Sequence, residues 1–293
     1  PLLSSVGKNF MEREPIRLAP KANDNFFLTP HAPILIMGNG NFTEINGVVS
    51  GNGTKENSYI IEGWDINAVT SNGIEVRNTN AYFVIKNCYI HDGSNNDEYN
   101  DGILLSNVTN GCIEKCDIIK NDVGISLNEC PKLSNKIRNC NISYNINGIM
   151  IYDCHENNIT SCSICNNKNT GIIIYYSSKN LILQCNIKNN GEEGVFIGST
   201  IRGIDYPYAS PLLSESRSNI ILNCNISNNH FGVEMHRRAK DNHITKCRID
   251  NNICGIGVYH SPTNNTIAEC DILKNGIGIW TVSYTHLTLP TKA

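Results

Sequence analysis

The sequence is poor in aromatic residues, which make up only 7% of its 293 residues, with two tryptophans among them. Because 40% of the residues are nevertheless hydrophobic, any core must be built from aliphatic and small side chains. An excess of positive charge is also missing: the net charge is −3, which argues against nucleic acid as a partner. No apolar run is long enough to cross a bilayer, so we expect no membrane-spanning segment in this stretch of chain.

Neither end of the sequence looks like a natural terminus. The chain begins with Pro1 instead of Met, and no secretion signal is visible. We therefore expect a cut or processed N-terminus, so the missing signal says nothing about the compartment. At the other end, residues 282–293 (VSYTHLTLPTKA) contain no Asn, no Gly and nothing of the repeat described below. This stretch resembles translated sequencing-adapter read-through, and we expect the natural chain to continue differently beyond Trp280.

What the chain does contain is an internal repeat of about 23 residues built around cysteine. Ile stands two residues after and three residues before each repeat cysteine, Asn stands five residues to either side of most of them, and a Gly-Ile or Gly-Val pair follows. Such agreement at many positions does not arise from composition alone. The repeat cysteines are Cys88, Cys116, Cys140, Cys162, Cys185, Cys224, Cys247 and Cys270.

Each repeat has the pattern of three short strands separated by turns. Cys and the Ile two residues later share one face because strand side chains alternate, and the same holds for pairs such as Ile172 and Ile174. A unit this short cannot close a core alone, so stacked copies predict a parallel β-helix with like residues about 4.8 Å apart. A leucine-rich repeat would need a Leu-x-x-Leu-x-Leu frame and helical segments, and the sequence has neither.

In this interpretation the repeat cysteines point inward as small apolar residues beside Ile. We expect reduced thiols, because the parallel Cβ vectors of stacked cysteines keep their Cβ atoms too far apart for a disulfide. Asn forms the corners, where it tolerates left-handed backbone angles and can bond to the Asn of the next rung. Cys162 and Cys165 match the C-x-x-C spacing of zinc sites, but they would face opposite ways on one strand, which argues against zinc.

The pattern N-x-I-x-x-C-x-I-x-x-N-x-x-G-I-x-I resembles the right-handed parallel β-helix repeats of the pectin-lyase-like superfamily, which includes NosD-type periplasmic proteins often labelled copper-binding. Residues 31–66 resemble the opening segment of archaeal surface β-helix proteins of that group. The resemblance covers about residues 30–280 and implies an all-β, right-handed solenoid of about eight to nine rungs. It also implies an extracellular, cell-surface or periplasmic location. It leaves the activity open, because this scaffold carries lyases, hydrolases, epimerases and adhesins.

These patterns divide the chain into three segments. We expect a weakly structured leader, a β-helix domain and a non-native tail, at residues 1–30, 31–281 and 282–293. Within the domain we expect a cap segment, the repeats and a loop insertion of about sixteen extra residues, at residues 31–66, 67–281 and 200–219.

Function must come from the outward side chains of the strand that follows each Gly. Residues two and four positions after Gly point to solvent, and from the fourth rung on they combine aromatic with polar side chains. A sugar chain along this face would stack on the rings, so we predict a polysaccharide or cell-surface glycan as the partner. The substrate-binding candidates are Tyr152, Tyr175, Phe196 and Tyr259, with Tyr206 and Tyr208 from the inserted loop.

The segment HDGSNNDEYNDG, residues 91–102, is rich in acids and amides and enters the same face from the other edge. Carboxylate oxygens are ligands that Ca²⁺ prefers, which makes Asp92, Asp97 and Asp101 candidates for a calcium site. The segment is not an EF-hand, because Asp97 stands where that loop requires Gly. A solvated acidic loop without metal is the alternative, and no other cofactor is predicted.

The densest set of catalytic candidates is His236, Glu234 and Arg237 in the segment EMHRRAKD. They supply the base and the charge neutraliser that a polysaccharide lyase or uronate epimerase needs. A hydrolase needs a second carboxylate, and none stands at the same outward positions of the next rungs. Copper is disfavoured because Met235 should point inward, opposite His236. We therefore predict a polysaccharide-binding protein, with a lyase or epimerase as the first alternative and a structural stalk or adhesin as the second.

Overall fold

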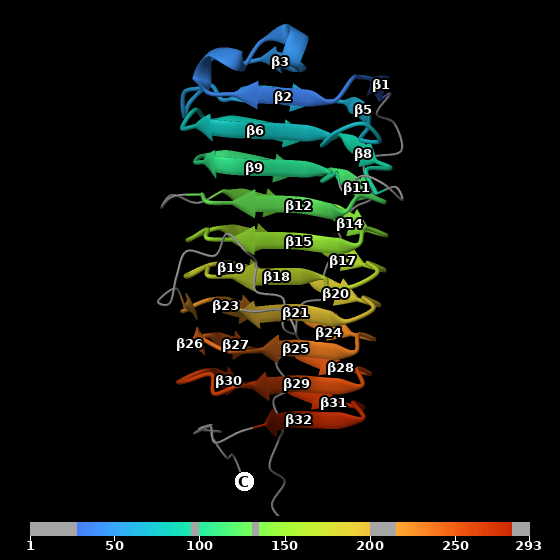
Figure 1. The fold of residues 1–293 in the computed structure, drawn as a ribbon, viewed down its shortest axis with the longest axis vertical. Coiled ribbons are helices and arrows are strands. Elements are labelled where there is room, and N and C mark those ends of the chain that lie inside the picture. Colours follow the sequence, from blue (N-terminus) through green and yellow to red (C-terminus); the bar gives the residue numbers. More distant parts are fainter. Residues whose placement is uncertain (1–27, 95–99, 131–134, 200–214, 283–293) are drawn as a thin grey trace, which may run out of the picture.

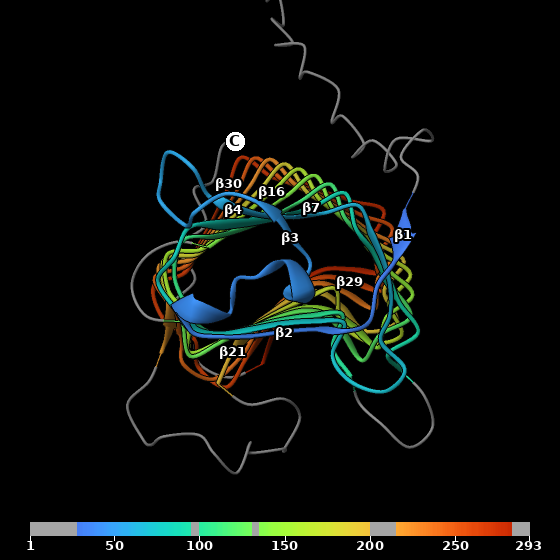
Figure 2. The same cartoon turned by 90° about the horizontal axis from the view of Figure 1, so that it is seen from above.

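The computed structural model describes residues 28–94, 100–130, 135–199 and 215–282, so the candidates Asp97, Tyr206 and Tyr208 lie outside the described residues. The chain winds into a solenoid whose strands stack into three ten-stranded sheets (Figure 1). Seen along the solenoid axis, two sheets face each other and the third closes one side (Figure 2). We call them the front, back and side sheets.

The strands of each sheet follow one another down the solenoid. The front sheet contains β2 (Ile34–Met37), β6 (Ile74–Thr79), β9 (Ile103–Val108), β12 (Val123–Asn128), β15 (Asn147–Tyr152), β18 (Ile172–Tyr175), β21 (Glu193–Gly198), β25 (Phe231–Met235), β29 (Cys254–Tyr259) and β32 (Ile277–Val282). The side sheet contains β1 (Thr29–Pro30), β5 (Trp64–Asn67), β8 (Tyr89–His91), β11 (Asp117–Ile119), β14 (Asn141–Ser143), β17 (Ser163–Cys165), β20 (Asn186–Lys188), β24 (Asn225–Ser227), β28 (Arg248–Asp250) and β31 (Asp271–Leu273).

The back sheet contains β3 (Val48–Ser50), β4 (Tyr59–Glu62), β7 (Phe83–Lys86), β10 (Gly111–Glu114), β13 (Lys136–Arg138), β16 (Asn158–Thr160), β19 (Leu181–Leu183), β23 (Ile220–Leu222), β27 (His243–Thr245) and β30 (Thr266–Ala268). A short pair, β22 (Ser216–Arg217) with β26 (Ala239–Lys240), lies between the front and back sheets along the chain. Two 3₁₀ helices, η1 (Asn39–Asn41) and η2 (Glu44–Asn46), lie near the N-terminal end.

The predicted parallel β-helix is confirmed. All pairings within the three sheets are parallel except that of β3 with β4, which is antiparallel. Each sheet has ten strands because the segment predicted as a cap, residues 31–66, adds strands to all three sheets. The strands also reach slightly past the predicted domain limits, since Thr29 pairs with Trp64 and Val282 pairs with Tyr259.

Columns of aliphatic side chains fill the inside of the solenoid, as predicted. In the side sheet Ile118, Ile142 and Ile164 stack in register and are buried. Each typical front strand adds two inward residues, such as Ile172 and Ile174 on β18. Burying an aliphatic side chain stabilises the fold by about 1.5 to 3 kcal/mol, so the repeated columns supply the main driving force for folding.

Two buried ladders of asparagine run along the corners of the solenoid. In one ladder the Asn145 side-chain amide donates to Asn167 Oδ1 at 3.2 Å, and Asn167 donates to Asn190 Oδ1 at 2.9 Å. The same oxygens accept from the backbone N–H of the preceding ladder residue, as Asn167 Oδ1 does from Asn145 at 3.0 Å. This confirms the predicted bonding between rungs. The ladders are Asn121, Asn145, Asn167, Asn190, Asn229, Asn252 and Asn275, and Asn135, Asn157, Asn180, Asn219, Asn242 and Asn265.

Left-handed backbone angles occur one residue before the ladder positions. Asn166 has a φ of 58° and Asn189 a φ of 56°, whereas the ladder residues themselves do not have positive φ. The expectation that the ladder asparagines adopt this conformation was therefore wrong. They occupy the corners because their amides bridge rungs, and the preceding residue makes the turn.

All thirteen cysteines are free thiols. The repeat cysteines form an inward column between the back and side sheets, and Cys140 Sγ lies 3.4 Å from the Arg138 carbonyl oxygen and 3.8 Å from that of Ile113. Burial raises the pKa of the Cys140 and Cys162 thiols well above the ordinary value. Cys165 lies on the outer side of β17, half-buried, so it does not face the same way as Cys162.

Candidate functional site

The outer side of the C-terminal half of the front sheet carries the predicted site. We call the outward residues of β15, β18, β21, β25, β29 and β32, with the residues that directly follow these strands, the aromatic face. Strand register places Tyr152 beside Tyr175, and Tyr175 beside Gly198. A second column runs through Phe196, Glu234, Gly257 and Trp280. The columns predicted two and four residues after the repeat Gly therefore lie side by side on this face.

Aromatic rings form a continuous run along this face. The Tyr175 and Phe196 ring centroids are 5.5 Å apart, and those of Phe196 and His236 are 6.0 Å apart. The run continues from His236 to Tyr259 at 6.2 Å and from Tyr259 to Trp280 at 5.7 Å. These separations are typical of interacting rings, so the side chains form one connected surface across successive strands.

The rings differ in how far they are exposed. Tyr175 and Phe196 are each only 3% exposed and, with Ile173, form a small apolar cluster separate from the core inside the solenoid. We predicted that these rings lie open to solvent, and this was wrong because neighbouring apolar side chains pack around them. Tyr152 and Tyr259 are half-buried, and these two can offer a ring surface to a ligand.

Several residues of the face were missed in the sequence. Trp280, 44% exposed, ends the aromatic run on β32. Glu193 and Phe231 belong to a third outward column, one residue before each repeat Gly, and pair with each other in register. The Phe231 ring lies 5.9 Å from that of Tyr259. In the sequence, these residues could have been recognised by their position directly before the repeat Gly. The alternation of strand side chains was counted from Gly onward and therefore did not include that position.

The catalytic candidates lie together at the end of β25. Burial is the main cause that lowers the pKa of His236 to about 4, and electrostatic interactions with His260 and Arg237 lower it further. His236 is therefore a neutral imidazole at neutral pH, and its ring lies 4.5 Å from that of His260. Glu234 is buried on the same strand, whereas Arg237 is exposed to solvent beyond the strand end.

The two described members of the predicted calcium set lie at either end of the segment between β8 and β9. The Asp92 carboxylate lies 2.7 Å from His91 Nδ1 and 3.7 Å from Lys120 Nζ. Burial is the main cause that raises the pKa of Asp101 to about 6. Among the described residues, no three His, Cys, Asp or Glu side chains are grouped to hold a metal ion. The Ca²⁺ site, with Asp97 outside the described ranges, stays a prediction.

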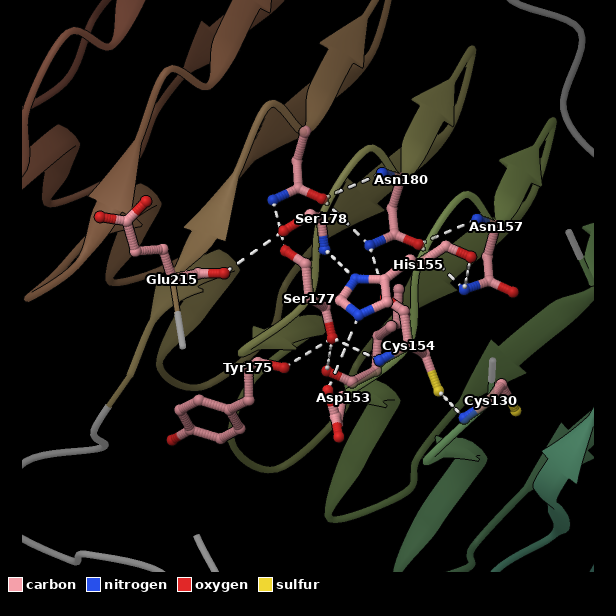
Figure 3. Close-up of polar contacts among 12 residues, drawn as sticks. Cys130, Asp153, Cys154, His155, Asn157, Tyr175, Ser177, Ser178, Asn180 and Glu215 are labelled. Atoms are coloured by element: carbon pink, nitrogen blue, oxygen red, sulfur yellow. Dashed lines mark hydrogen bonds and ion pairs between the residues drawn. The ribbon is translucent and has the colours of Figure 1, made fainter. Parts of the chain in front are cut away.

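The turns that follow β15 and β18 hold a polar network beside the aromatic face (Figure 3). The Ser178 backbone N–H donates to His155 Nδ1 at 3.1 Å, and His155 Nε2 lies 3.7 Å from Asp153. The Ser178 hydroxyl donates to the Glu215 carbonyl at 3.3 Å. The three residue types are those of a hydrolytic triad, but no serine hydroxyl bonds to His155 in this network, so its contacts are those of a structural brace for the turn after Tyr175.

A family model described as a right-handed beta helix region matches residues 34–145, 94–204 and 134–289. These overlapping matches cover most of the chain, which therefore belongs to the right-handed β-helix family. The narrower resemblance to NosD-type proteins stays an expectation. No curated protein matches the chain.

Solved structures share this fold at low sequence identity. The periplasmic alginate epimerase AlgG, in a mutant form, matches with a TM-score of 0.58 and 16% identity over 89% of this chain and 66% of the epimerase chain. The Dettilon tailspike protein matches with a TM-score of 0.56 and 13% identity over 76% of this chain and 53% of its own. The enzymatically active domain of bacteriophage CBA120 tailspike protein 2 has a TM-score of 0.56 at 9% identity over 89% of this chain and 42% of its own. The chain thus spans less than two thirds of each.

Helices long and apolar enough to cross a membrane are absent from the described part of the chain.

Proposed function

We propose that this protein binds a polysaccharide along the aromatic face and acts outside the cytoplasm, at a cell surface, in the periplasm or in the medium. The observation that carries the proposal is the connected run of rings from Tyr152 to Trp280, which crosses six successive front strands. Aromatic rings bind the apolar faces of sugar rings, and a row of them along a rigid sheet suits an extended chain of sugars.

The exposed ends of the run supply the contact surface in this proposal. Tyr259 and Trp280 lie 5.7 Å apart and keep part of their rings accessible. Tyr175 and Phe196 continue the run on β18 and β21 as its buried part. The binding role predicted for Tyr152 and Tyr259 is kept, and Trp280 joins them.

The family and the fold neighbours are compatible with this role. One neighbour is described as a periplasmic alginate epimerase, and alginate is a polysaccharide. The likeness at 16% identity concerns the fold, so the activity and the location of the neighbour enter here only as support for the proposal.

A polysaccharide lyase or uronate epimerase is the second candidate, and the state of His236 favours it. An imidazole whose pKa is lowered to about 4 by burial and by its interactions with His260 and Arg237 is deprotonated at neutral pH. It could therefore accept a proton from a sugar carbon, with Glu234 on the same strand and Arg237 at its end.

The double variant Tyr259→Ala with Trp280→Ala tests the proposal. Each stacked ring contributes on the order of 1 kcal/mol, so losing both should weaken glycan binding at least about tenfold, measured by calorimetry. Tyr144→Ala is the matched control, because Tyr144 is 62% exposed and lies in a turn away from the aromatic face. Equal affinity of the double variant and the wild type would refute the proposed face.

His236→Ala separates the two candidates. In a binding protein it should weaken binding about as much as the loss of one ring. In a lyase it should abolish the ultraviolet absorbance of unsaturated products while binding persists, and in an epimerase it should abolish the change in uronate composition. If the wild type binds no glycan in a broad panel, with or without Ca²⁺, both candidates fail and the structural stalk or adhesin is left.

A further inference from the structure

We infer that the outer side of the back sheet is an interaction surface for a second copy of this chain. The two copies pack back to back, through the C-terminal halves of their back sheets. The inference goes beyond the proposed function, because the back sheet lies opposite the front sheet that carries the aromatic face (Figure 2). A block of outward aliphatic residues and the charges along both edges of the sheet support it.

The outer side of the back sheet divides into a charged half and an uncharged half. On the N-terminal strands the outward residues include the ion pairs of Glu62 with Lys86 at 3.0 Å and of Glu114 with Arg138 at 2.5 Å. On β16, β19, β23, β27 and β30, the ten outward positions hold no Asp, Glu, Lys or Arg. We call these ten residues the back patch: Asn158, Thr160, Leu181, Leu183, Ile220, Leu222, His243, Thr245, Thr266 and Ala268.

Four large aliphatic side chains lie at the centre of the back patch. Strand register places Leu181 beside Ile220 and Leu183 beside Leu222, so the four form one block on β19 and β23. Ile220 is 39% exposed, and the three leucines are half-buried. An apolar centre with a polar surround is typical of a contact between proteins. Because the block contains no aromatic ring to stack on a sugar, it suits a protein better than a glycan.

The size of the back patch suits a weak dimer. Five strands about 4.8 Å apart, with their flanking turns, cover an area of roughly 400 Å². A stable dimer buries about 800 Å² per subunit or more, so this contact is smaller than that of a permanent dimer. We therefore expect two copies to associate reversibly, at micromolar concentrations and above.

The charges at the edges of the sheet point to a second copy as the occupant. About a two-fold axis parallel to the solenoid, each back strand faces the same strand of the other copy, which runs the opposite way. The turn before a strand in one copy then faces the turn after that strand in the other. For β27 these turns carry Asp241 and Lys246, so the dimer brings opposite charges together at both edges.

The other strands of the back patch bring no like charges face to face in this arrangement. Each is flanked by two turn residues with positive φ, as β27 is, and at most one of the two is charged. The facing pairs are Glu156 with Ser161, Lys179 with Gln184, Ser218 with Asn223, and Asn264 with Glu269. Stacked sheets are rotated by about 30° relative to each other, which carries the charged N-terminal halves away from the contact.

A back-to-back dimer leaves both aromatic faces accessible, because front and back sheets lie on opposite sides of the solenoid (Figure 2). Dimer formation is measured without any glycan, so its failure would leave the proposed function untouched. In the same way, a chain that binds no glycan would still be able to form this dimer.

Sedimentation velocity of the whole chain tests the inference. We expect the sedimentation coefficient to rise from that of a monomer to that of a dimer between about 5 and about 500 µM protein. A chain that stays monomeric over this range would overturn the inference.

Two variants place a charge at the centre of the contact. Leu183→Lys and Ile220→Lys each put an ammonium group into the apolar block, and each should weaken the dimer at least about tenfold. Val84→Lys is the matched control, since Val84 is also an outward, half-buried residue of the back sheet but lies on β7 in the charged half. The control should dimerise like the wild type, and equal dimerisation of all three variants would contradict the proposed surface.

A charge exchange tests the two-fold arrangement itself. Asp241→Lys sets two lysines against each other at each edge and should weaken the dimer about threefold or more. The double variant Asp241→Lys with Lys246→Asp restores opposite charges between the copies, and its affinity should return to within about twofold of the wild type. A double variant that dimerises no better than Asp241→Lys alone would refute this arrangement, because only two copies of one chain exchange both charges at once.

Discussion

The inner and outer sides of the front sheet are made by the same strands, yet they differ in how their residues repeat. Inward positions hold aliphatic residues from rung to rung, such as Ile149 and Ile172 in register. The neighbouring outward position changes from Met150 to Ile173 and then to Phe196. Packing inside the solenoid keeps the inward residues similar from rung to rung, because each side chain must fit against the corresponding side chains of the rungs above and below it. Outward positions escape that constraint, so their differences between rungs carry the information about function.

A second contrast lies within the outer side itself. On β6, near the N-terminal end, the outward residues Glu75 and Arg77 are polar and form an ion pair. Toward the C-terminal end the same columns carry Phe196, His236 and Tyr259. The backbone has the same fold in both parts, so the fold does not require aromatic residues at these outward positions.

The largest effect should come from a charge placed on the inner side. Ile164→Asp buries a carboxylate with no partner in the aliphatic column and should lower the free energy of unfolding by at least about 4 kcal/mol. Ser163→Asp, one residue earlier on the outer side of β17, should cost less than about 1 kcal/mol. Equal losses in chemical unfolding would show that the assignment of inner and outer sides is wrong.

The buried part of the aromatic face should behave like a small core. Tyr175→Ala leaves a cavity beside Ile173 and Phe196, and we expect a loss of about 3 kcal/mol in stability. Tyr259→Ala removes a half-exposed ring and should cost about 1 kcal/mol or less. Thermal melting of the two variants measures the difference, and similar melting temperatures would refute the division into a buried part and an accessible surface.

The asparagine ladders should be sensitive to the loss of one member. Asn167→Ala removes the acceptor for the Asn145 backbone N–H and side-chain amide, and leaves these groups buried without it. We expect a cost of about 2 kcal/mol. Asn169→Ala, in the same turn and outside the ladder, should stay within about 0.5 kcal/mol. A ladder that tolerates alanine as well as this control does would have no part in stability.

The smallest effect per residue concerns pH and the inner thiols. Because burial raises the pKa of Cys140 and Cys162 well above that of an unfolded thiol, both stay neutral in the folded state. Their contribution is complete below about pH 8.5, where unfolded thiols begin to ionise, and is lost as pH rises further. Each of these two thiols should lower the free energy of unfolding by about 1.4 kcal/mol per pH unit above about pH 8.5. Denaturation at increasing pH measures the slope, and Cys162→Ala should make it shallower; an unchanged slope would contradict the buried neutral thiol.

The fold could be predicted from the sequence because the same pattern of inward and corner residues recurs in every repeat. The inward Ile columns, the inward cysteines and the bonding of the Asn ladders all follow from residue spacing. The outward columns two and four residues after Gly were also placed correctly, since they need only strand alternation.

The third outward column escaped detection because alternation breaks at the repeat glycine. A Cβ on Gly194 would meet Ile226 Cγ2 at 2.7 Å and Asn229 Nδ2 at 2.9 Å, so Gly194 faces inward like Val195 after it. The preceding residue, Glu193, therefore faces outward, one position out of phase. The burial of Tyr175 could not be foreseen either, because it depends on how Met150 and Tyr176 pack over the outer side.

The asparagine ladders give the solenoid a direction. In every side-chain bond within them the amide of one rung donates to the oxygen of the next rung toward the C-terminus, as from Asn121 to Asn145 and from Asn219 to Asn242. The carboxamide dipoles therefore add along the axis instead of cancelling, and the rod has unlike electrical ends. An additional C-terminal turn with Asn at the same two positions would accept hydrogen bonds from the same kinds of donor groups as the turn before it. Growth of such a chain by duplication of one turn needs no new interface, and the length of the rod can change while its two ends keep their polarity.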